Sequence, residues 1–160
     1  MNKDKNWEID ILEEGLKSDI DLTKINSVIE FLLKELSSEN IQESISELSL
    51  TLCSDVHIKK LNKEFRGKDK ATDVLSFPMN DGFDCAITVS LGDIVISLDT
   101  AKVQAKELEL AYEERFFQLL IHGLLHLFSY DHEDVPDKER IRMETREDEL
   151  LLSLKKQVFF

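Results

Sequence analysis

Three of the four histidines of this 160-residue chain lie within eleven residues, in the segment His122-Gly-Leu-Leu-His126-Leu-Phe-Ser-Tyr-Asp-His132. His122 and His126 are four residues apart, so on a helix their side chains project from one face, one turn apart. Two nitrogens that bind one zinc ion lie roughly 3.3 Å apart in a tetrahedral site, and imidazoles at this spacing can lean together to reach that separation. We expect the helix to end near residues 129–131 and the chain to turn back, which brings His132 to a third ligand position.

The alternative to a metal site is a pair of buried core histidines. Residues 119–128 are apolar on nearly all sides, so the helix is expected to be buried. Each buried imidazole would then need its own hydrogen-bond partner, because an unpaired buried polar group costs about 1–3 kcal/mol, whereas one metal satisfies both rings. The spacing therefore favours a metal. Three histidine ligands leave the fourth zinc position open, as in catalytic sites. We predict one zinc ion per chain on His122, His126 and His132, although imidazole also suits nickel, copper and iron. His57, alone near the start of another helix, is expected to take no part.

The charge and the composition limit the classes of partner. The formal charge of −13 argues against a general nucleic-acid coat protein, because phosphate repels an acidic surface. Residues 59–70 are the exception: they carry six cations against two anions, which composition alone would assign to a solvated helix face. Cys53 and Cys85 lack the CxxC spacing of a metal or redox motif. Residues 1–10 lack the apolar run of a signal peptide, and no stretch approaches the roughly 20 apolar residues of a membrane span, so we expect a cytoplasmic protein without a membrane partner.

Hydrophobic periodicity predicts a single α+β domain over residues 1–160, with a mixed sheet of about four strands packed with helices and the metal site at the end of a buried helix. Strands are expected at 7–12, 48–53, 74–77 and 87–98, with a possible bend at 92–93 and a turn at 80–82. Helices are expected at 22–36, 55–66 and 137–156, and from 99 towards 130 with a break near 110–112. Asp21 and Asp55 are the expected N-caps. In the second helix Ile58, Leu61 and Phe65 are expected to point inward.

The H-x3-H-x5-H spacing is similar to that of the metzincin peptidases, which read H-E-x-x-H-x-x-G-x-x-H. In that pattern the general-base glutamate follows the first histidine, and here the position is Gly123. A glycine inside a helix costs roughly 1 kcal/mol relative to alanine. Gly123 therefore indicates either close approach of backbone or substrate beside the metal, or tight packing of the helix. Without the glutamate, peptide hydrolysis is the weaker interpretation.

Three segments together resemble the YbeY family of bacterial endoribonucleases. The first is the histidine segment, in which Tyr130-Asp131 precedes His132. The second is residues 61–78, reading LNKEFRGKDKATDVLSFP, and the third is residues 91–97, reading LGDIVIS. The segments follow the family's order, and the resemblance covers most of residues 45–135. Phe65, Ala71 and Ser129 depart from it, standing where the family usually has tyrosine, proline and glycine.

The resemblance implies a single-strand-specific, metal-dependent endoribonuclease that acts in 3′ end maturation of small-subunit rRNA and in ribosome quality control. Its partners would be rRNA, the small ribosomal subunit and maturation factors. The family's arginine corresponds to Arg66, so the implied catalytic residues are Arg66, His122, His126 and His132, with Arg66 clamping a phosphate.

Other interpretations of these residues stay open at this point. Arg66 could instead pair with Asp69 or Asp73. Asp131 could accept an imidazole N–H or cap the end of the helix. The competing functions are a zinc peptidase-like hydrolase and a non-catalytic ribosome-assembly factor with a structural metal.

Overall fold

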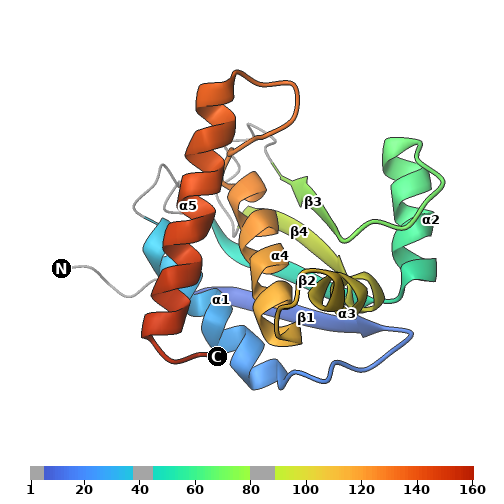
Figure 1. Cartoon of the computed structure of the whole chain (residues 1–160), viewed down its shortest axis with the longest axis horizontal. Helices are drawn as coiled ribbons and strands as arrows, with labels where there is room; N and C mark the ends of the chain where they lie inside the picture. The colour runs from blue at the N-terminus through green and yellow to red at the C-terminus, as the bar shows by residue number, and fades with distance from the viewer. Residues whose placement is uncertain (1–5, 38–44, 80–88) are drawn as a thin grey trace.

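The computed structural model describes residues 6–37, 45–79 and 89–160. In these ranges the chain forms four strands and five helices (Figure 1): β1 (Glu8–Glu14), α1 (Leu22–Leu36), β2 (Ile45–Cys53), α2 (Asp55–Arg66), β3 (Val74–Pro78), β4 (Val89–Ser97), α3 (Leu98–Glu107), α4 (Tyr112–Leu127) and α5 (Asp137–Lys156). The expected α+β architecture is confirmed. The described helices include none that is long and apolar enough to cross a bilayer.

The strands form one mixed sheet in the order β1-β2-β4-β3. The β1–β2 and β2–β4 pairs are parallel, and β3 runs antiparallel to β4 along one edge. Side chains alternate between the two faces of a strand. Leu48, Leu50 and Leu52 therefore share one face of β2, and all three belong to the main core with residues of α1, α4 and α5. Figure 1 shows these three helices gathered together, with α2 standing beside β3 at the other end of the molecule.

A smaller cluster covers part of the opposite face, where Ile58 of α2 packs with Cys53, Leu75 and Val95. Burial, followed in size by the nearby charges of Asp55 and Asp99, raises the pKa of the Cys53 thiol to about 12. Cys53 is thus a protonated thiol at neutral pH, in line with the absence of a metal or redox motif around it. The predicted turn at 80–82 and Cys85 lie outside the described residues.

Local signals in the sequence predicted most element boundaries. Asp21 caps α1 as expected, since its carboxylate accepts a hydrogen bond from the Thr23 N–H at 2.8 Å. The expected break between the two central helices lies between Glu107 and Tyr112, and Glu109 takes a positive φ of 56° there. The possible bend at 92–93 does not interrupt β4, which is continuous.

Two local predictions for α2 are wrong. The N-cap is Ser54, whose hydroxyl accepts from the His57 N–H, and not Asp55. The Asp55 carboxylate instead accepts hydrogen bonds from the hydroxyls of Ser97 and Thr100. Phe65 does not point into the core: 60% of the residue is exposed. Phe65 packs against Phe77 of β3, which is itself only partly buried at the border of the smaller cluster, so most of the Phe65 residue stays in solvent.

Candidate metal centre

The turn that follows α4 returns the chain towards the helix that it has just left. Ser129 takes a positive φ of 69°. The Tyr130 N–H donates to the Leu125 carbonyl at 3.0 Å, and the Ser129 N–H donates to the His126 carbonyl at 3.1 Å. This pair of bonds is a Schellman motif, which closes the last helical turn and reverses the chain. The expected return of His132 towards His122 and His126 therefore occurs.

Ser129→Gly is expected to raise the free energy of unfolding by about 0.5–1 kcal/mol, because glycine has no Cβ to resist the left-handed conformation. Chemical denaturation with both metal-free proteins measures the change. Ser37→Gly at the C-cap of α1 is the matched control, since Ser37 has a φ of −66° and gains nothing from glycine. Equal or lower stability of Ser129→Gly would mean that the serine is not strained at this position.

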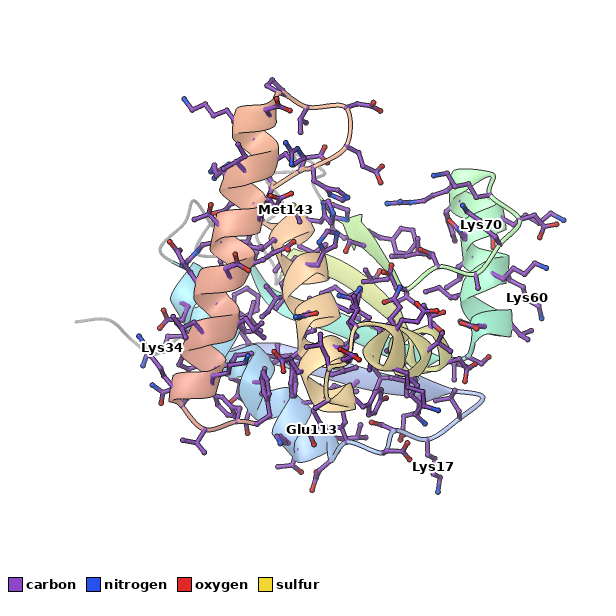
Figure 2. All side chains as sticks on the ribbon, viewed as in Figure 1. Lys17, Lys34, Lys60, Lys70, Glu113 and Met143 are labelled. Carbon is purple, nitrogen blue, oxygen red and sulfur yellow. The ribbon has the colours of Figure 1, made fainter. Side chains whose placement is uncertain are left out.

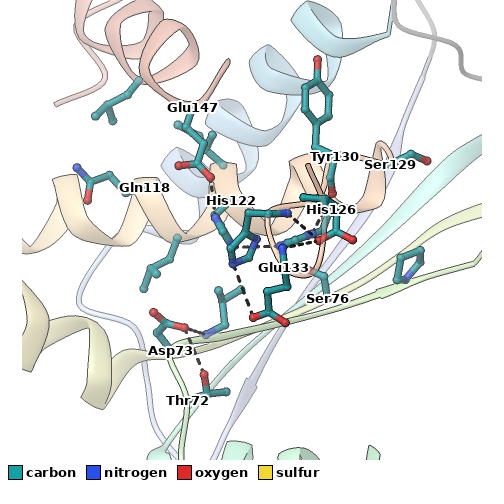
Figure 3. Close-up of a pocket in the computed structure, with 18 of the residues that line it drawn as sticks. Thr72, Asp73, Ser76, Gln118, His122, His126, Ser129, Tyr130, Glu133 and Glu147 are labelled. Atoms are coloured by element: carbon teal, nitrogen blue, oxygen red, sulfur yellow. Dashed lines mark hydrogen bonds and ion pairs between the residues drawn. The ribbon is translucent and has the colours of Figure 1, made fainter. Parts of the chain in front are cut away.

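The three imidazole rings lie close together at the end of α4, and Figure 3 shows those of His122 and His126. The Nε2 atoms of His122 and His126 face each other at 3.1 Å. The His132 ring centroid lies 4.8 Å from that of His122 and 5.1 Å from that of His126. Each ring offers one nitrogen, and these three atoms all lie within 4.8 Å of one another, so the cluster could hold a metal ion. The 3.1 Å between the Nε2 atoms of His122 and His126 is close to the roughly 3.3 Å separation of two nitrogens on one tetrahedral zinc.

Hydrogen bonds at the far side of two rings determine where their protons lie. The Nδ1 atom of His122 lies 2.6 Å from a Glu147 carboxylate oxygen, and the Nδ1 atom of His126 lies 3.0 Å from the Tyr130 carbonyl oxygen. An ionised carboxylate and a carbonyl only accept hydrogen bonds, so each Nδ1 carries the proton. In the neutral rings both Nε2 atoms then present lone pairs to each other at 3.1 Å. A cation between them removes this repulsion.

The His132 ring and the pKa of His126 also fit a bound metal cation. The Nδ1 atom of His132 is buried and has no hydrogen-bond partner in the described part of the chain. Burial, and then the neighbouring rings of His122 and His132, lower the pKa of His126 below its ordinary value of 6.5. His126 is therefore neutral at neutral pH, which is the form that ligates a metal. Three imidazoles are a donor set that suits zinc.

Asp131 shapes the loop that carries His132. One of its carboxylate oxygens accepts from the backbone N–H groups of His132 at 2.7 Å and Glu133 at 3.2 Å. The N–H of Glu133 and then that of His132 lower the pKa of Asp131, because they stabilise its ionised form. The Asp131 carboxylate therefore organises the loop beyond α4 and does not cap that helix, whose C-cap is Phe128.

The carboxylate that orients a histidine is Glu147 of α5, a residue that sequence reasoning missed. It lies 25 residues beyond His122, in a helix rich in acidic side chains, and nothing in its spacing distinguishes it from them. Figure 3 shows Glu147 reaching from α5 to the outer side of the His122 ring. Such outer carboxylates hold the tautomer of a ligand and increase its basicity.

Glu147→Ala is expected to weaken metal affinity about 10- to 100-fold, the usual effect of removing a carboxylate that orients a ligating histidine. Competition with a chromogenic chelator measures the affinity. Glu149→Ala is the matched control on the same helix, because Glu149 is exposed and pairs with Arg146 at 3.1 Å. Unfolding of both metal-free variants checks that α5 stays docked. Equal affinities in the two variants would remove Glu147 from the metal centre.

A cavity of about 1070 Å³ opens beside the histidines, and Arg66 lines it together with them. Arg66 is the last residue of α2, and Gly67 follows in the left-handed conformation, with a φ of 69° and its N–H donating to the Lys63 carbonyl. Glycine meets this requirement without a steric penalty. The cap thus ends α2 where Arg66 reaches the cavity.

Neither aspartate considered as an ion-pair partner holds Arg66. Asp69 lies 4.0 Å from Lys59 and 3.7 Å from Lys63, and Asp73 lies 3.6 Å from Arg115. Across the described ranges no ion pair or hydrogen bond engages the Arg66 guanidinium. Its charge is therefore available to a group that enters the cavity.

Gly123 serves helix packing and does not leave open space beside the metal. A Cβ at this position would lie 2.9 Å from Ile94 Cγ2 and 3.2 Å from Ser76 Oγ. The Ser76 hydroxyl also donates to the Gly123 carbonyl at 3.1 Å, which ties α4 to β3. A glutamate here, as in the metzincin pattern, cannot be accommodated without moving α4 away from the sheet.

The region of the chain that matches known proteins includes the sheet, the histidine cluster and Arg66. The family described as Endoribonuclease YbeY matches residues 10–155. Proteins named Endoribonuclease YbeY include one from Persephonella marina, 43% identical over 82% of each chain, and one from Aquifex aeolicus, 40% identical over 88% of this chain and 89% of the relative. The solution structure of a Thermotoga maritima protein, 30% identical, superposes with a TM-score of 0.61 over 90% of this chain and 87% of that one. The chain belongs to the YbeY family of endoribonucleases.

Proposed function

We propose that this chain is a zinc-dependent endoribonuclease that cuts single-stranded RNA, with one zinc ion on His122, His126 and His132 and with Arg66 as the phosphate-binding residue. The observation that carries the proposal is one cavity lined both by three converging imidazoles and by an arginine that has no partner among the described residues. Neutral nitrogen donors and a free guanidinium are what a metal-assisted reaction on a phosphodiester requires.

The residues divide the work between metal binding and charge neutralisation. A bound zinc ion would supply Lewis acidity toward a phosphoryl oxygen and toward water. The Glu147 carboxylate and the Tyr130 carbonyl hold the His122 and His126 rings with their Nε2 lone pairs inward. Arg66 offers a planar pair of donors to non-bridging phosphate oxygens and neutralises charge that develops as the bond breaks.

The uneven distribution of charge supports binding of RNA at one part of the surface. Residues 59–70 carry six cations against two anions in a chain whose formal charge is −13, and Arg66 of this cationic segment lines the cavity. Figure 2 shows Lys60 and Lys70 on the α2 side of the molecule and Lys34 on the opposite side, near α5. An acidic surface repels a phosphate backbone elsewhere, so RNA is drawn to this cationic segment.

The likeness to the family supports a place for this activity in the cell. The substrate would be the 3′ end of small-subunit rRNA, cut during maturation and quality control of the ribosome in the cytoplasm. The partners would be the small ribosomal subunit and maturation factors.

Incubation of the purified protein with labelled small-subunit rRNA fragments, with and without chelator, tests the function. We expect cleavage of single-stranded RNA that chelation abolishes and that added zinc restores. An unfolded protein substrate is incubated in parallel. Metal-dependent proteolysis with intact RNA would favour the peptidase, and metal binding without cleavage of either substrate would favour the assembly factor.

A further inference from the structure

Phe65 is a large apolar side chain that α2 leaves in solvent, and it directly precedes Arg66, which lines the cavity. It continues the stripe of Ile58 and Leu61, but 60% of the residue is exposed. Its contact with another aromatic residue is at an edge: the Phe77 ring lies 5.2 Å away, centroid to centroid, at 63°. A tilted contact of this kind supports one side of the phenyl ring and leaves apolar ring surface free.

The position of α2 does not depend on Phe65. Ser54 caps the start of the helix, where Asp55 also accepts hydrogen bonds from the Ser97 and Thr100 hydroxyls. At the other end the buried side chain of Asn62 donates to the Lys70 carbonyl at 2.9 Å. These bonds join α2 to α3 and to the loop before β3. The exposed ring is therefore not needed as an anchor, and its removal should leave Arg66 in place.

The residues next to Phe65 in the sequence are cationic and suit the binding of an RNA strand. Arg66, the next residue, lines the cavity of the histidines, and Lys63 and Lys68 are exposed close by in sequence. A phosphate held at Arg66 brings a neighbouring nucleotide to the Phe65 ring. Aromatic side chains in cationic grooves stack on bases of single-stranded nucleic acid with little regard to sequence, because every base has a π-face.

We infer that Phe65 stacks on a nucleobase of single-stranded RNA, next to the nucleotide whose phosphate Arg66 binds. The inference rests on the proposed RNA cleavage, and it gives a physical reason why the enzyme would prefer single-stranded RNA to a duplex. A base inside a duplex is already stacked on its neighbours and presents no free face, so only an unpaired base reaches the ring. The tilted contact with Phe77 holds the Phe65 ring in place.

The test combines substitutions in the protein with abasic positions in the RNA and compares the binding affinities. A labelled single-stranded RNA, and versions with one abasic nucleotide at successive positions, are bound to the wild type and to Phe65→Leu in the presence of chelator, and fluorescence anisotropy gives the affinities. Leucine keeps an apolar side chain and removes the aromatic face. We expect Phe65→Leu to bind the intact RNA about 5- to 100-fold more weakly, the usual range for loss of one stacked base, and Phe65→Trp to restore binding. Val56→Ala, at the other end of α2 with 67% exposure, is the matched control and should bind as the wild type does.

The abasic series separates stacking from a general loss of binding. One abasic position should weaken the wild type and leave Phe65→Leu unchanged, because the variant has already lost that contact. A Phe65→Leu protein with wild-type affinity, or with the wild-type response to every abasic position, would overturn the inference while the proposed function stands. A wild type that neither binds nor cuts RNA would overturn both.

Discussion

Replacing Arg66 by alanine is expected to lower the single-turnover rate of RNA cleavage by about 10²–10³-fold while the metal and the fold are retained. That is the usual effect of removing a charged contact made in the transition state. Arg66 and the proposed metal ligands lie on different elements: Arg66 ends α2, whereas the histidines lie on α4 and on the loop that follows it. The guanidinium also has no protein partner in the described ranges, so its loss leaves no buried charge unpaired.

Two further variants sharpen this prediction. Arg66→Lys should rescue cleavage poorly, because an ammonium cannot reproduce the planar pair of donors. Lys60→Ala, on the same helix and exposed, should only weaken binding slightly and flatten its dependence on salt. Metal content and melting temperature are measured for each protein. Wild-type cleavage by Arg66→Ala would exclude Arg66 from the site, and loss of cleavage with a large drop in melting temperature would indicate a structural role.

The second large effect concerns the metal. The wild type should contain about one equivalent of metal, and His126→Ala should lose most of it, because two imidazoles alone hold zinc weakly compared with three. Elemental analysis after gel filtration measures the content. His57→Ala is the matched control, since His57 lies at the start of α2, outside the histidine cluster. Full occupancy in His126→Ala would show that the metal is bound elsewhere.

The pH dependence of the metal content of the wild type tests the same site. Imidazole ligates a metal only when it is deprotonated, so protons compete with the metal and its content should fall as the pH falls. Burial lowers the pKa of His126, which delays its protonation to more acidic solutions. Unchanged occupancy in mild acid would argue against a histidine site.

Much of the architecture was predictable from the sequence because it depends on interactions between near neighbours. The apolar stripe of α1 and its Asp21 cap lie within a few residues of one another. So do the break before α4 and the turn that returns His132 towards α4. The spacing of His122 and His126 determined that their rings share a face, since the pitch of the helix sets this directly.

The tertiary structure decided which partners the site residues have. Glu147 orients His122 only because α5 packs along α4, and Gly123 is required only because α4 approaches Ile94 and Ser76 closely. Phe65 was expected to be buried because the stripe of α2 continues through it, but it packs against the partly buried Phe77 and 60% of the residue is exposed. Sequence periodicity specifies which face of a helix is apolar. How far the neighbouring elements cover that face, and which distant side chain meets a given ring, depend on the packing of whole elements, which residue spacing does not encode.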